Sequence, residues 1–62
     1  MNNGDVRERT KKFIDELGVP ATVFAKKVEI SATAYHRWMK DDLKLSESTE
    51  QRISDYLMKY GF

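Results

Sequence analysis

Apolar residues recur at spacings of three and four in successive segments of this chain, which is the pattern of helices with one buried face. In the first segment the residues that share a face are Val6, Thr10, Phe13, Ile14 and Leu17. Asp5 precedes them as an N-cap candidate, and Gly18 follows where a left-handed residue commonly ends a helix. We therefore predict a helix over residues 5–17 and a frayed leader over residues 1–4.

Proline marks the start of the second segment. Pro20 suits the beginning of a helix because its missing N–H would have no intrahelical partner there. The segment predicts a helix over residues 20–28, whose inward positions are Val23, Phe24, Ala25 and Val28. Lys26 and Lys27 are expected to face water.

The third segment begins at a serine. Ser31 is a good N-cap, and the apolar stripe that follows at helical spacing is Ala34, Tyr35 and Trp38. Asp41 and Asp42 interrupt this pattern, so we predict a helix over residues 31–40 followed by a short linker.

The fourth segment again begins near serines. Ser46 is one N-cap candidate, and Ser48 with Gln51 is an alternative capping pair. The segment predicts a helix over residues 46–60, ended by Gly61, with a face formed by Thr49, Ile53, Tyr56, Leu57 and Tyr60. No sustained apolar run has a period of two. The sequence therefore predicts an all-α protein, with one compact four-helix domain spanning residues 1–62.

The connection between the second and third helices has the composition of a tight turn. A small residue on the first helix, Ala25, would let two backbones approach closely, and an apolar Ile30 in the turn would point inward. Tyr35 and Trp38 would then hold the next helix onto the core. Its outward side would carry polar and basic residues and no acidic residue, as in a helix-turn-helix presented to DNA.

Residues 21–40 resemble the helix-turn-helix of the phage repressor and Cro family of regulators, also called the Xre-like family. The positions that carry the resemblance are Phe24, Ala25, Val28, Ile30, Ser31, Tyr35 and Trp38. With the flanking helices, the resemblance covers residues 8–60. It implies a lambda-repressor-like fold and a sequence-specific DNA-binding transcriptional regulator of phage or mobile-element type. The helix over 31–40 would lie in the major groove.

Three positions depart from the family pattern. Glu29 stands in the turn where the family usually has a left-handed glycine, a conformation uncommon for other residues. Ala21 stands where the family often has a phosphate-contacting glutamine, with Thr22 beside it. Ala32 stands where a second glutamine often reads adenine.

The resemblance and the outward positions together define the candidate DNA contacts. We expect Thr33, His36 and Arg37 to face base edges, and Ser31, Lys40 and Lys44 to contact phosphates. The full candidate set is Thr22, Ser31, Ala32, Thr33, His36, Arg37, Lys40 and Lys44. The ordinary alternative for these residues is a solvated surface side chain or, for Ser31, a helix cap.

The amino-acid composition argues against several other classes of protein. The chain has no cysteine and one histidine, and it lacks a glycine-rich phosphate loop, so we expect no enzyme activity, metal or cofactor. A net charge of +1 argues neither for nor against nucleic acid. No apolar run reaches the roughly 18–20 residues of a membrane helix, and the polar N-terminus lacks a signal peptide. A soluble, cytoplasmic protein is expected.

Other interpretations stay open. The near-neutral charge and the aromatic C-terminal residues also suit a protein–protein interaction module that does not bind DNA. Tyr56, Tyr60 and Phe62 could alternatively form a homodimer surface that pairs two DNA-binding units. The chain could also be the N-terminal domain of a longer repressor.

Overall fold

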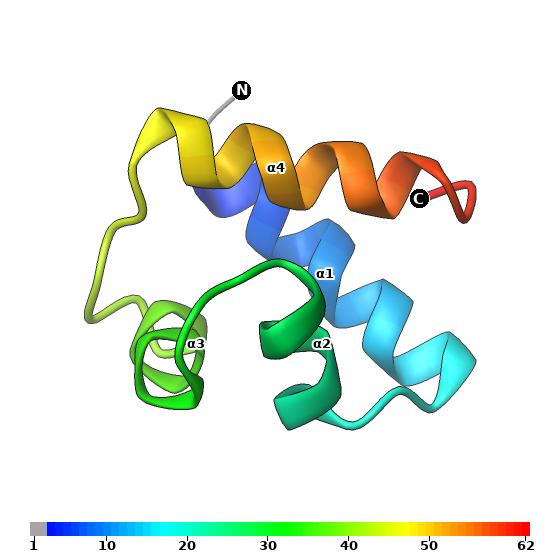
Figure 1. The fold of residues 1–62 in the computed structure, drawn as a ribbon, viewed down its shortest axis with the longest axis horizontal. Coiled ribbons are helices and arrows are strands. Elements are labelled where there is room, and N and C mark those ends of the chain that lie inside the picture. The colour runs from blue at the N-terminus through cyan, green and yellow to red at the C-terminus, as the bar shows by residue number, and fades with distance from the viewer. Residues whose placement is uncertain (1–2) are drawn as a thin grey trace.

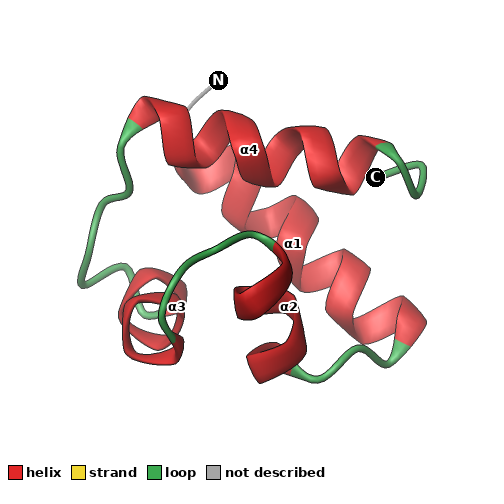
Figure 2. Ribbon diagram, in the orientation of Figure 1, coloured by secondary structure: helices red, strands yellow, loops and turns green. Residues whose placement is uncertain are grey.

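The computed structural model describes residues 3–62, with side chains from Asp5 onward. Over this range the chain forms four helices and no strand: α1 (Asn3–Leu17), α2 (Ala21–Lys27), α3 (Ala32–Met39) and α4 (Glu47–Met58) (Figure 2). The predicted all-α class is confirmed, and each predicted helix corresponds to one observed helix. None of the helices within residues 3–62 is long and apolar enough to cross a membrane.

The helices pack as two contacting pairs. α1 packs against α4, and α2 packs against α3. Figure 1 shows α4 crossing over the N-terminal part of α1, while α3 is seen nearly end-on beside α2. The two helices of the α2–α3 pair are thus steeply inclined, which is the arrangement predicted for the tight turn between them.

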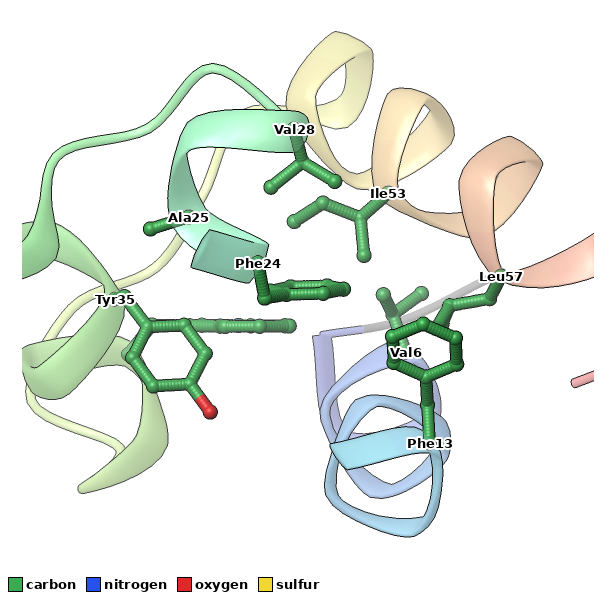
Figure 3. Close-up of a cluster of buried hydrophobic side chains, with 9 residues drawn as sticks. Val6, Phe13, Phe24, Ala25, Val28, Tyr35, Ile53 and Leu57 are labelled. Carbon is green, nitrogen blue, oxygen red and sulfur yellow. The ribbon is translucent and has the colours of Figure 1, made fainter. Parts of the chain in front are cut away.

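The core lies where these pairs meet (Figure 3). Its buried residues are Val6, Phe13, Phe24, Ala25, Val28, Tyr35, Trp38, Ile53 and Leu57. The methyl group of Ala25 points from α2 toward α3, as expected for a small residue at a close helix approach. Ile30 and Leu45 pack against this core from the turn and from the loop before α4.

Three residues expected to be buried are exposed instead. Val23 is 43% exposed because Phe24, Ala25 and Val28 define the core-facing arc of α2, and Val23 points about 150° away at about 100° per residue. Leu17 is 51% exposed, since the C-terminal turn of α1 lies away from α4 (Figure 1). Tyr60 is 53% exposed, beyond the end of α4.

The buried face of α4 also differs from the predicted one. Glu50 and Ser54 are buried together with Ile53 and Leu57, and these four share one face at helical spacing. The apolar pattern could not reveal this face because two of its members are polar. Thr49, predicted to share it, is only half-buried.

Serine caps begin two helices as predicted. The Ala34 amide donates to the Ser31 side chain at 3.0 Å, and the Thr49 amide donates to the Ser46 side chain at 3.3 Å. Ser46, rather than the alternative pair beginning at Ser48, is therefore the N-cap of α4. Pro20 is the extended N-cap of α2 rather than its first helical residue.

The start of α1 corrects another prediction. Asp5 is not the N-cap, because α1 begins at Asn3 and Asp5 lies in its first turn, where its charge favours the positive end of the helix dipole. Asn3 and Gly4, predicted as part of a frayed leader, belong to the helix. Met1 and Asn2 lie outside the described residues.

Acidic residues end α2 and α3 in the left-handed conformation. Glu29 and Asp41 both have φ of 61°, a region that glycine adopts far more readily. At the end of α2, the Ile30 amide donates to the Ala25 carbonyl at 2.9 Å. At the end of α3, the Asp42 amide donates to the Arg37 carbonyl at 2.8 Å. Both are Schellman-type endings, and Glu29 adopts the left-handed conformation that is uncommon for residues other than glycine.

Candidate nucleic-acid interface

α3 separates a buried side from an exposed side. Trp38 is fully buried and Tyr35 is nearly so, which fixes the helix against α2 and the core. Their rings lie 6.4 Å apart, and Tyr35 also meets Phe24 edge-on at 6.0 Å. Burial raises the pKa of the Tyr35 phenol above its ordinary value of 10.0, which further favours the neutral phenol.

The opposite side of α3 is exposed and holds most of the candidate residues. All eight predicted DNA contacts are solvent-exposed: Thr22, Ser31, Ala32, Thr33, His36, Arg37, Lys40 and Lys44. Helical spacing brings Ala32, Thr33, His36 and Arg37 together on one face, with Lys40 one turn further along. Thr22 belongs to the first turn of α2, and Lys44 lies in the loop before α4.

Ser31 has a capping role and retains a free donor. Its side-chain oxygen accepts the Ala34 amide at 3.0 Å. A hydroxyl that accepts one hydrogen bond still carries a proton to donate, here at the exposed N-terminus of α3. Capping and phosphate contact are thus chemically compatible at this residue.

Arg37 lies beside an acidic residue that the sequence pattern marked only as a helix break. Its Nε is 3.4 Å from the Asp42 carboxylate, and its Nη2 is 3.5 Å from the Asp42 carbonyl. The side chains of Arg37 and Asp42 are 54% and 70% exposed. These long contacts, at the edge of hydrogen-bond range, hold the guanidinium loosely at the surface.

Asp41 has a different partner. Its carboxylate accepts from Arg7 Nη1 at 2.9 Å, so the turn after α3 is tied to α1. Two carboxylates therefore stand at the C-terminal end of a helix that has no acidic residue itself. They make the field around the α3 face less positive than its own residues would suggest.

Other basic residues are used inside the fold. Arg9 of α1 donates to the Ser54 hydroxyl at 2.9 Å and to the Phe62 carbonyl at 2.7 Å. Arg52 of α4 donates to the Val28 carbonyl at 2.8 Å, next to the turn before α3. Sequence reasoning missed these roles because each partner lies far away along the chain.

The aromatic residues proposed as a dimer surface pack largely within the chain. Phe13 contacts the rings of Tyr56, Tyr60 and Phe62 at 5.7, 5.4 and 5.6 Å. Tyr56 and Phe62 are half-buried in this way, and Tyr60 presents the most exposed ring of the set. Of the three residues predicted to form a homodimer surface, only Tyr60 is mostly exposed.

Within residues 3–62, no three histidine, aspartate or glutamate side chains gather as a metal site. Comparisons with protein-family models, with curated proteins and with solved structures find no match for this chain. The functional assignment therefore depends on the geometry of α3 and its surroundings.

Proposed function

We propose that the protein is a sequence-specific DNA-binding transcriptional regulator that inserts α3 into the major groove. The observation that carries this proposal is the division of α3 into two sides. One side is locked by buried aromatic rings, and the other exposes His36, Arg37 and Lys40 with no acidic residue on the helix itself. A helix held rigidly from behind, with polar and cationic side chains in front, fits the way such helices read base edges.

Phosphate contacts would come from the ends of α3. Ser31 offers a hydroxyl donor at the helix N-terminus, and Lys40 and Lys44 offer cations at and beyond the C-terminus. Thr33 and Ala32 would contact thymine methyl groups or pack in the groove, and Thr22 would approach the backbone from α2. A single unit of this size makes few contacts, so high affinity would require two copies on adjacent half-sites.

The test is a titration of isotope-labelled protein with duplex DNA. We expect amide shifts from random-sequence duplex to cluster on residues 31–44, and affinity to fall steeply with salt. On a duplex selected for tight binding, Arg37→Ala should weaken binding by about 1–3 kcal/mol if Arg37 pairs bidentately with guanine. Lys59→Ala, which removes the same charge from the end of α4, is the matched control and should change little.

A second candidate is a protein-interaction module on the same scaffold. Asp41 and Asp42 beside α3, and the exposed apolar side chains of Leu17, Val23 and Met58, favour this alternative. If no duplex binding is measurable even at low salt, the protein-partner function replaces the DNA-binding one.

A further inference from the structure

The two aspartates that follow α3, Asp41 and Asp42, each form an ion pair with a different arginine. Asp41 pairs with Arg7 across the fold, whereas Asp42 pairs with Arg37 on the face proposed to meet DNA. The two carboxylates are adjacent in sequence and carry the same charge, but they contact different elements. Substituting each aspartate in turn therefore separates the effect of the Arg37–Asp42 ion pair from the general effect of a negative charge near α3.

The position of Asp42 is fixed relative to Arg37 by the backbone. The Asp42 amide donates to the Arg37 carbonyl at 2.8 Å, which closes the helix end. In return, the Arg37 side chain reaches the Asp42 carbonyl through Nη2 and the Asp42 carboxylate through Nε. The helix ending itself thus delivers a carboxylate to the arginine on the exposed face.

The Arg37–Asp42 ion pair is weak enough to be displaced by a ligand. Both side chains are more than half exposed, and the contacts are 3.4 and 3.5 Å long. Exposed ion pairs of this kind contribute little and are weakened by salt. A phosphate oxygen or a guanine edge can therefore displace the Asp42 carboxylate, but part of the binding free energy is lost in doing so.

We propose that Asp42 is an intramolecular counter-ion that competes with DNA for Arg37 and thereby lowers the affinity of the α3 face for duplex. This inference rests on the proposed function, since Asp42 would adjust the affinity of the same α3 surface for DNA. Asp42 acts through Arg37 and is a positioning residue, not a DNA contact. Its effect should shrink when Arg37 is absent, leaving only the general effect of its charge.

The experiment is a double-mutant cycle with random-sequence duplex at low salt. Asp42→Asn should raise affinity about two- to fivefold, the range expected from releasing a weak exposed ion pair. In an Arg37→Ala background, the same substitution should give a smaller gain. Asp42→Glu retains the charge and should behave like the unaltered protein.

Asp41→Asn is the charge-matched control, because asparagine also accepts the left-handed conformation. It removes the same charge without releasing Arg37, so its gain should be smaller than that of Asp42→Asn. The Arg37 Nε–H signal in NMR spectra of the free protein should shift in Asp42→Asn and stay in place in Asp41→Asn.

The possible failures are distinct. If every variant binds duplex, but Asp42→Asn gains equally with and without Arg37, general charge explains the effect and the inference is overturned while the function stands. An Arg37 Nε–H signal that does not respond to Asp42→Asn also overturns it. If no variant binds duplex at low salt, the proposed function fails, and the inference fails with it.

Discussion

Basic side chains do different work in the two contacting helix pairs. In the α1–α4 pair, Arg9 and Arg52 donate to acceptors far away along the chain, at 2.7–2.9 Å. In the α2–α3 pair, Arg37 contacts a residue five positions away, at 3.4–3.5 Å, and remains 54% exposed. The first kind of arginine ties segments together, and the second kind is available to a ligand. The partners and contact lengths of these arginines, not the number of basic residues, separate structural from functional candidates.

The largest expected loss of stability comes from removing the buried side chain that holds α3 against the core. Trp38→Ala deletes a fully buried indole and should lower the free energy of unfolding by about 3–5 kcal/mol. That loss approaches the whole stability that a core of this size usually supplies. Urea denaturation followed by circular dichroism measures it. Trp38→Phe, which keeps a ring, should lose less, and equal losses in both variants would contradict the packing role.

The next largest effect tests directly whether Arg9 and Arg37 differ in their contribution to stability. Arg9→Ala removes charge-assisted hydrogen bonds to Ser54 and Phe62 and should cost about 1.5–3 kcal/mol of stability, because both bonds are partly buried. Arg37→Ala should cost at most about 0.5 kcal/mol, because its ion pair is exposed and long. Thermal unfolding of both variants measures the difference. If Arg37→Ala were as destabilising as Arg9→Ala, Arg37 would be a structural residue like those of the other pair.

The two left-handed acidic residues should also respond differently. Glu29→Gly relieves an unfavourable backbone conformation and gives up only a 4.0 Å ion pair with Arg52, so it should stabilise the protein by up to about 1 kcal/mol. Asp41→Gly brings less relief, because aspartate adopts the left-handed conformation more readily than glutamate, and it also removes the 2.9 Å bond to Arg7. Denaturation midpoints should therefore rise more for Glu29→Gly than for Asp41→Gly. A rise for Asp41→Gly that equals or exceeds the rise for Glu29→Gly would contradict a stabilising Arg7–Asp41 bond.

The features that could be predicted from the sequence depend on local chemistry. Helical periodicity located all four helices. Serine caps marked the starts of α3 and α4, and glycines marked the ends of α1 and α4. Tyr35 and Trp38 were found because their spacing fits one inward face of α3, and Ala25 was found because a small residue lets two helices approach closely. The exposure of five candidate site residues was predicted from the same periodicity, since they occupy the remaining positions of the third helix: Ala32, Thr33, His36, Arg37 and Lys40.

The features that the sequence could not predict depend on distant partners. The bonds of Arg9 to Ser54 and of Arg7 to Asp41 join α1 to segments more than 30 residues away. Buried Ser54 gave no apolar signal, and Val23 gave a misleading one. The pairing of Asp42 with Arg37 depends on how α3 ends, a backbone detail that periodicity does not resolve.

The smallest expected effect is the pH dependence of stability that comes from Tyr35 of α3 and Tyr56 of α4. Burial raises the pKa of Tyr35 and of Tyr56 above 10.0, and a hydrogen bond with Tyr60 adds to the second shift. A raised pKa means that the folded state favours the neutral phenol. The stability it contributes is fully present below pH 10.0 and is lost as pH rises through the folded pKa values. Unfolding curves above pH 10 should therefore show a decline that is smaller in Tyr35→Phe. An equal decline in that variant would assign the loss to other groups.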